Sequence, residues 1–145
     1  MKEELRRLRA EKAADKERFE VLSIRVNNML KIFNEDAGET MVTWEDLLDT
    51  KVGEIYYVNE NVYFIPVNIQ SKKLTFISIC EPNGKFGIQE HDIDEACKVI
   101  KGQLIEKMQD NRVIKKGETI TYKAHQKHKP VGGDEFNIYW VEFKK

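Results

Sequence analysis

The sequence describes a small protein with nearly balanced charge. It has 145 residues, of which 41% are hydrophobic and 34% are charged, and its formal net charge is -1. This length allows one domain with a hydrophobic core and a short appendage. The balanced charge provides no overall field that attracts nucleic acid or an anionic membrane, so we expect neither as a partner. No apolar run is long enough to span a bilayer, and the first residues lack the apolar stretch of a signal peptide.

The two cysteines, Cys80 and Cys97, lack the spacing of a paired-cysteine motif. We therefore expect reduced, buried thiols in a cytoplasmic protein rather than a disulfide. The sequence also has no glycine-rich loop of the kind that holds phosphates. No serine or cysteine is accompanied by a histidine and an acid in a pattern that indicates nucleophilic catalysis, so no catalytic residue is assigned.

Residues 1–35 differ in composition from the rest and predict a charged amphipathic helix. Apolar residues recur there in steps of three and four, which places them on one stripe of a helix: Leu5, Leu8, Phe19, Leu22, Val26, Met29 and Phe33. Lys12 and Asp15 interrupt this stripe at its centre. Two interpretations stay open, a coiled coil that makes the protein a homo-oligomer and a helix whose second half packs on the following domain.

Residues 36–145 predict a mainly β domain. Thr43 precedes a short apolar run with acids in its first turn, which indicates a helix at 44–48 with Thr43 as its N-cap. Segments rich in β-branched and aromatic residues follow, separated by turn residues. We expect strands at 55–58, 62–67, 74–80 and 136–143, with turns at 59–61 and 81–84. Many short strands joined by turns are typical of a sandwich or barrel.

The segment 92–110 fits two different structures. Its apolar residues recur at helical spacing, but a helix would hold Gly102 in its interior, which costs about 1 kcal/mol relative to alanine. The alternative is a hairpin with strands at 95–100 and 103–108 and a turn at Lys101 and Gly102. Local propensity does not decide between them.

All three histidines lie in the last third of the chain, among candidate metal ligands. One group contains Gln89, His91 and Glu95, and a second contains His125 and His128. Imidazole and carboxylate ligands together suit divalent zinc, iron, manganese or nickel. If the two segments are neighbouring strands, these side chains can converge on one ion. The acidic residues next to His91 are expected to form a solvated edge.

The first group resembles the first motif of the cupin superfamily. That motif has two histidines separated by one residue, then a glutamate, then a glycine seven residues later. Here Gln89 stands at the position of the first histidine and His91 at the second. Glu95 stands at the glutamate and Gly102 at the closing glycine.

The second group is similar to the second cupin motif. Gly117 opens it, and His128 falls at its histidine. Lys123 and His125 replace the proline and glycine of the motif's turn, and Gly132 replaces an asparagine. The spacing is therefore kept while several residue types are lost, and His125 is the weaker ligand candidate.

The resemblance covers about residues 50–143 and implies a cupin-like double-stranded β-helix, a jelly-roll barrel, preceded by the N-terminal helix. It favours the hairpin for 92–110. It also implies a metal site in the barrel mouth, with His91, Glu95 and His128 as ligands and Gln89 as a weak or absent fourth. Non-heme ferrous oxygenases use such a two-histidine, one-carboxylate set. We expect aromatic side chains to line the cavity, drawn from Tyr56, Tyr63, Phe76, Tyr122, Tyr139 and Trp140.

The resemblance implies a class of function without a substrate. If the barrel is an enzyme, an oxygenase, isomerase or lyase acting on a small polar molecule is expected. The alternative is a non-catalytic cupin that senses a ligand, or an oligomeric assembly protein that acts through its N-terminal helix. These interpretations divide at Gln89, where a glutamine replaces a strong metal ligand.

Overall fold

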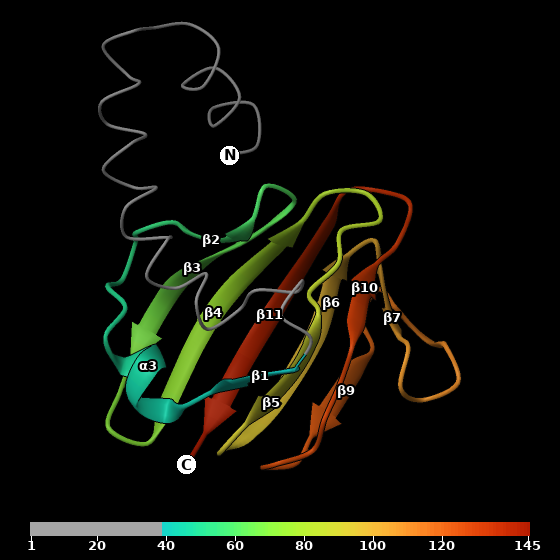
Figure 1. The fold of residues 1–145 in the computed structure, drawn as a ribbon. Helices are drawn as coiled ribbons and strands as arrows, with labels where there is room; N and C mark the ends of the chain where they lie inside the picture. Colours follow the sequence, from blue (N-terminus) through green and yellow to red (C-terminus); the bar gives the residue numbers. More distant parts are fainter. Residues whose placement is uncertain (1–38) are drawn as a thin grey trace, which may run out of the picture.

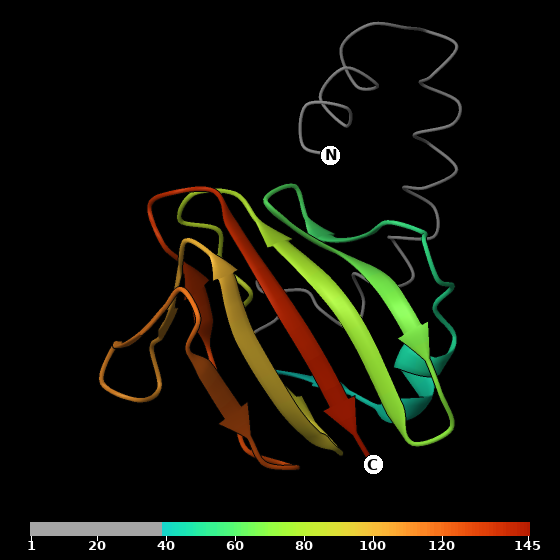
Figure 2. The same cartoon turned by 180° about the vertical axis from the view of Figure 1, so that it is seen from behind.

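The computed structural model describes residues 39–145. The predicted helix at 1–35, its coiled coil and the domain boundary beside residue 36 lie outside these residues. The described part of the chain forms eleven strands and one short helix, arranged as two walls that face each other (Figures 1 and 2).

The larger wall is a six-stranded antiparallel sheet, which faces the viewer in Figure 2. Its strands, in spatial order, are β2 (Tyr56–Asn59), β3 (Val62–Ile69), β4 (Lys73–Cys80), β11 (Asn137–Lys144), β6 (Asp94–Lys101) and β9 (Thr119–Tyr122). The strands predicted at 55–58, 62–67, 74–80 and 136–143 are confirmed to within two residues at each end.

The opposite wall consists of two smaller sheets. One contains β10 (Pro130–Gly132), β7 (Gln103–Glu106) and β8 (Arg112–Lys115), all antiparallel. The other pairs β1 (Glu39–Val42) in parallel with β5 (Ile88–His91). This parallel pair joins residues about 50 positions apart and was not predicted from the sequence.

The core lies between the two walls because the strands alternate between inward apolar and outward side chains. In β11, Asn137, Tyr139, Val141 and Phe143 are buried, and the residues between them are only half-buried. Phe143 packs edge-on against Phe76 of β4, with ring centroids 5.6 Å apart. The inward faces of the walls thereby form one continuous apolar cluster.

The helix α3 (Trp44–Leu48) has the predicted N-cap. Thr43 Oγ1 accepts from Asp46 N at 3.2 Å, and Asp46 Oδ2 accepts from Thr43 N at 3.1 Å, which completes a capping box. Asp92 Oδ1 accepts a further hydrogen bond from Trp44 N at 2.8 Å. Asp92 therefore ties the helix to the end of β5 instead of being merely solvated.

The hairpin predicted for 92–110 is wrong in its pairing, although both strands exist. β6 pairs with β11 and β9, whereas β7 pairs with β10 and β8, so the chain crosses from one wall to the other at Gly102. Gly102 has a φ of +79°, and the next amide, Gln103 N, donates to Asn137 Oδ1 at 3.0 Å. The chain changes direction here with one residue of positive φ. A two-residue hairpin with a type I′ turn needs two consecutive residues of positive φ.

The true hairpin joins β7 and β8. Its loop contains Asp110 and Asn111, with φ of +52° and +57°. Asparagine and aspartate tolerate the left-handed region because their short side chains hydrogen-bond locally. This turn signal was not used in the sequence-based prediction.

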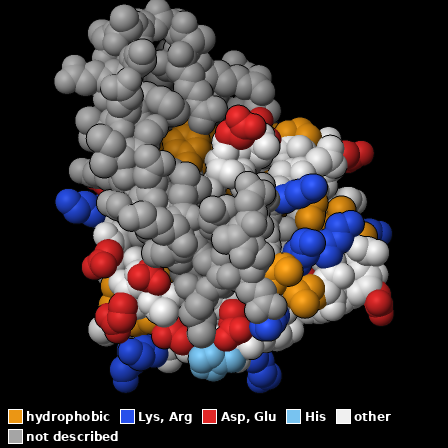
Figure 3. Space-filling model, viewed as in Figure 1, with side chains coloured by type: hydrophobic (Ala, Val, Ile, Leu, Met, Phe, Trp, Pro, Cys, Tyr) orange, Lys and Arg blue, Asp and Glu red, His pale blue; other side chains and the backbone are white. Residues whose placement is uncertain are grey.

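The face seen in Figure 3 carries Lys and Arg side chains interspersed with Asp and Glu over the part of the surface that the structure describes. Among residues 39–145, no helix combines the length and the hydropathy needed to cross a membrane.

The corner at Gly102 gives a matched test of packing. A Cβ at Gly102 would overlap the Asn137 side chain, whereas a Cβ at Gly117, which also has a positive φ, meets nothing within 4 Å. Gly117→Ala should cost only the backbone strain, about 1–2 kcal/mol. Gly102→Ala should cost about 1–3 kcal/mol more because of the overlap. Urea unfolding of both variants measures the difference, and equal losses would contradict the role given to Asn137.

Candidate metal centre

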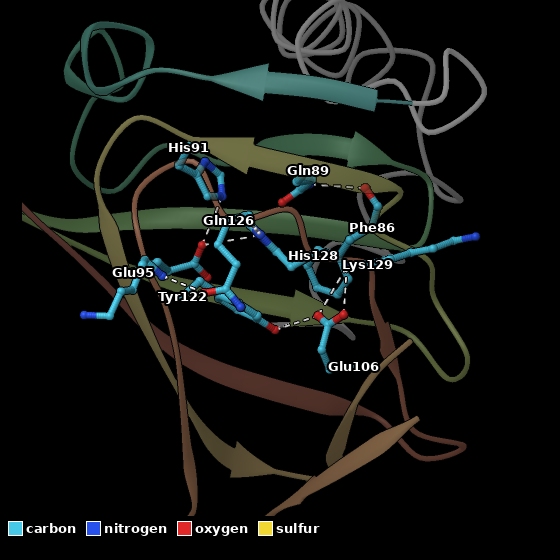
Figure 4. A network of polar contacts seen from close by, with 10 residues as sticks. Phe86, Gln89, His91, Glu95, Glu106, Tyr122, Gln126, His128 and Lys129 are labelled. Atoms are coloured by element: carbon cyan, nitrogen blue, oxygen red, sulfur yellow. Dashed lines mark hydrogen bonds and ion pairs between the residues drawn. The ribbon is translucent and has the colours of Figure 1, made fainter. Parts of the chain in front are cut away.

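Three segments of the chain bring His91, Glu95 and His128 together inside the barrel. His91 is the last residue of β5 and Glu95 is the second residue of β6, so these two ligand candidates come from opposite walls. His128 lies beside β5 because its backbone pairs with Gln89: Gln89 N donates to His128 O at 2.8 Å, and His128 N donates to Gln89 O at 2.9 Å. Figure 4 shows both imidazole rings directed at the Glu95 carboxylate.

The distances within this cluster are short. His91 Nε2 lies 3.0 Å from Glu95 Oε1, and His128 Nε2 lies 3.6 Å from the same oxygen. The first contact has the length of a hydrogen bond but not its alignment. One ligand atom from each residue lies within 4.8 Å of the other two. The side chains are 3%, 10% and 2% exposed for His91, Glu95 and His128, so the group is almost sealed from solvent.

The protonation of His128 follows from its hydrogen bond. His128 Nδ1 lies 3.2 Å from the carbonyl oxygen of Gln126, which can only accept, so Nδ1 carries the proton. Burial lowers the pKa of His128, although the charge of Glu95 opposes this shift. At neutral pH the imidazole is therefore neutral, and its unprotonated Nε2 faces Glu95.

Glu95 is held in its ionised form. Burial raises the pKa of its carboxyl group, but the contact with His91 and the positive charge that the two imidazoles can carry outweigh burial, so the pKa lies below its usual value. An ionised carboxylate and a neutral imidazole are the forms in which these groups bind metals.

The donor set fits a divalent metal ion. Imidazole nitrogen and carboxylate oxygen bind zinc at about 2.0–2.2 Å, which places two ligands of one ion about 3–4 Å apart. The separations of 3.0 and 3.6 Å lie in this range. In addition, the lone pair of His128 Nε2 and the anionic Glu95 Oε1 face each other in a buried place. Two electron-rich atoms in this arrangement are stabilised by a cation between them.

A second buried carboxylate, Glu106, accepts hydrogen bonds from residues next to His128 (Figure 4). Glu106 is 0% exposed and accepts hydrogen bonds from Tyr122 Oη at 2.8 Å, Lys129 N at 3.0 Å and Met108 N at 2.8 Å. Burial raises the pKa of Tyr122, so its hydroxyl stays protonated and donates. The Tyr122 ring stacks on the His128 ring, with centroids 4.1 Å apart and an angle of 17°.

Glu106 thus fixes both the amide that follows His128 and the ring that stacks on it. The sequence prediction missed this residue. Its signal was the alternation of β7, in which Leu104 and Glu106 share a buried face. An acidic residue at an inward position of a strand indicates a buried carboxylate that accepts hydrogen bonds.

The other two candidate residues, Gln89 and His125, differ in their surroundings. Gln89 is buried, and its Nε2 donates to the carbonyl oxygen of Phe86 at 3.2 Å. His125 has a side chain that is 63% exposed, and its Nδ1 lies 3.4 Å from Glu90 Oε2 at the surface. The structure therefore separates His125 from His91, Glu95 and His128.

A cavity adjoins the cluster and is lined from both walls. Its volume is about 70 Å³. Among the six aromatic residues expected to line it, Phe76, Tyr122 and Tyr139 do so, and Tyr56, Tyr63 and Trp140 are absent from its described lining. The alternation of inward and outward positions explains the difference for Tyr63 and Trp140, since their strand neighbours Phe64 and Tyr139 point inward.

No family model matches the sequence, and no curated protein matches it in sequence. Solved structures are similar to the described domain. An RmlC-like cupin from Shewanella frigidimarina superposes with a TM-score of 0.56 and 13% identity, over 66% of this chain and 89% of the other.

Two enzymes are similar over a smaller part. An acetylacetone dioxygenase from Acinetobacter johnsonii gives a TM-score of 0.51 at 11% identity, over 57% of this chain and 59% of its own. A sugar phosphate isomerase of the cupin superfamily from Silicibacter pomeroyi gives 0.52 at 15% identity, over 59% of this chain and 60% of its own. The domain therefore has the cupin fold, as the motif spacing predicted, and at these identities the similarity shows the fold alone.

The hydrogen bonds of Glu106 should contribute measurably to the free energy of unfolding. Glu106→Gln keeps the volume but places an amide NH₂ where one oxygen now accepts hydrogen bonds. The variant should lose about 1–3 kcal/mol of unfolding free energy, the usual cost of breaking buried bonds to a charged group. Urea denaturation measures this loss. Glu60→Gln, at an exposed turn, is the matched control and should change stability by less than about 0.5 kcal/mol; equal effects of the two would contradict the network.

The cysteines should be unreactive in the folded protein. Cys80 and Cys97 are free and buried, as expected. Burial raises the pKa of Cys80 to about 12, and it raises the pKa of Cys97 as well. At pH 8 only about one Cys80 thiol in 10⁴ is then a thiolate, which is the reactive form. Labelling with a disulfide reagent should be slow in buffer and complete within minutes in denaturant; fast labelling of the native protein would contradict this.

Proposed function

We propose that the chain binds a divalent transition-metal ion through His91, Glu95 and His128 and presents it to a small molecule in the barrel cavity. One observation carries this proposal: an unprotonated His128 Nε2 lies 3.6 Å from a buried, ionised Glu95 Oε1. Iron, manganese, zinc and nickel all accept such ligands. Three protein ligands leave positions open for an exogenous molecule.

A bound ion of this kind supplies a Lewis acid or a redox centre. The chain's own residues do the remaining work. The Gln126 carbonyl holds the His128 tautomer, and Glu106 and Tyr122 hold its ring plane, so His128 Nε2 is aimed at the cavity before any ion arrives. The apolar walls exclude water from the ligand atoms.

The activity that we propose is an oxygenase, isomerase or lyase reaction on a small molecule. The cupin fold supports this class, since a dioxygenase and a sugar phosphate isomerase are among the proteins with a similar fold. The fold alone does not assign an activity, so this part of the proposal depends on the site.

Gln89 favours a second candidate function, that of a non-catalytic cupin that senses a ligand. Its amide nitrogen is bonded to Phe86 O, and a neutral amide is a weaker ligand than imidazole. Self-association through residues 1–35 stays a prediction. It would support the role of an assembly protein, and deleting these residues without a change of oligomeric state would count against it.

Metal binding tests the proposed site directly. The full-length chain, purified without chelator, is stripped, titrated with Zn²⁺, Fe²⁺, Mn²⁺ and Ni²⁺ by calorimetry, and analysed for bound metal. About one equivalent of one of these ions is expected. His128→Ala should weaken binding by more than the roughly 10–100-fold typical of losing an outer partner.

His125→Ala is the matched control, because His125 is exposed and three residues from His128. It should leave the affinity unchanged, and Gln89→His should raise it. Less than about a tenth of an equivalent of metal after reconstitution would overturn the site.

A further inference from the structure

The cavity beside the proposed metal centre is lined mainly by hydrocarbon. Its walls include Leu47, Val58, Phe64, Phe76, Val141 and Phe143. We infer that its ligand is a small molecule that is apolar over most of its surface and carries one oxygen-donor group directed at the metal. This inference rests on the proposed metal centre, and it revises the expectation of a small polar substrate.

The charges of the lining exclude strongly anionic ligands. Among the described residues that line the cavity there is no Lys or Arg, and Glu95 is the one carboxylate. A phosphate or a second carboxylate on the ligand would be desolvated without a cationic side chain to compensate it. The metal is the single positive charge that we propose in the cavity. It can therefore bind one anionic donor group of the ligand, and no other cation is present among the described lining residues to bind a second.

Three polar side chains of the lining already donate hydrogen bonds within the protein, and Ser78 is the lining residue that still offers a hydroxyl. Tyr122 Oη donates to Glu106 at 2.8 Å, Tyr139 Oη donates to Gln103 O at 2.6 Å, and Gln89 Nε2 donates to Phe86 O. Few donors are left for the hydroxyls of a sugar or other polyol. A buried hydroxyl without a partner is unfavourable, so the cavity selects against such ligands.

The volume limits the size of the ligand. The cavity has a volume of about 70 Å³, and a cavity of about 150 Å³ holds benzene, so the ligand is small. We therefore expect a chelating head with a tail of no more than about three carbons.

Two hydroxamic acids with the same chelating head and different tails test the inference. Butyrohydroxamic acid has a propyl tail, and 3,4-dihydroxybutanohydroxamic acid has the same three-carbon tail with a hydroxyl on each of its two outer carbons. Each is titrated by calorimetry into the metal-loaded full-length protein. Because the head is shared, the ratio of affinities reports the tail. The propyl compound should bind about tenfold tighter or more, and equal affinities or the reverse order would overturn the inference.

A substitution in the cavity wall tests whether the wall causes the preference for the propyl compound. Val141→Thr keeps the shape and adds a hydroxyl to the wall, so it should reduce the affinity ratio severalfold. Val67→Thr makes the same change at an exposed position of β3 outside the lining and should leave the ratio unchanged. The ratio is measured within each variant, so a change in the folded fraction cancels.

The metal site and the apolar character of the cavity are tested by separate measurements. The metal alone is titrated first, and absence of binding overturns the proposed function together with the donor part of the inference. The apolar part is then tested on the metal-free protein by NMR, with 2-pentanone and glycerol as probes. Shifts of cavity resonances with 2-pentanone and not with glycerol support it, and the opposite result overturns it.

Discussion

The structure depends on a carboxylate placed where water hardly reaches it. Burying an ionised group costs several kcal/mol unless positive charge or hydrogen bonds compensate it. Glu95 Oε1 lies 3.0 Å from His91 Nε2 and 3.6 Å from His128 Nε2, and the metal ion that we propose between these atoms would meet this requirement. The backbone pairing of Gln89 with His128 and the hydrogen bonds of Glu106 keep those nitrogens in place. Hydrocarbon surrounds the group and strengthens each electrostatic contact.

Local signals in the sequence predicted local structure well. Thr43 and Asp46 specify a capping box through neighbours three residues apart, and four strands of the six-stranded sheet follow from their β-branched and aromatic residues. The motif spacing also predicted that His91, Glu95 and His128 belong together, and it made His125 the weaker candidate. Each of these features is determined by residues that are close in the chain, or by a spacing that the fold preserves.

Features that depend on distant partners were not predicted. Gly102 turns a corner between walls because Asn137, 35 residues later, accepts the next amide; its local sequence is equally compatible with a hairpin. Most donors to Glu106 come from the chain around Tyr122 and Lys129, so the alternation of β7 indicates that Glu106 is buried but not which groups it binds. Likewise, the engaged state of Tyr139 and Gln89, which sets the polarity of the cavity, depends on carbonyls that only the folded chain supplies.

The position of the ligand atoms has a mechanical consequence. His91 belongs to the smaller wall and Glu95 to the six-stranded sheet, so an ion bound to both would join the two walls much as a disulfide joins the sheets of a sandwich. Separating the walls would then require breaking coordination bonds, and ligation would raise stability in proportion to the logarithm of metal concentration. The free energy of unfolding would then depend on how much metal is bound. In a cell that withholds the ion, the barrel would also be less stable.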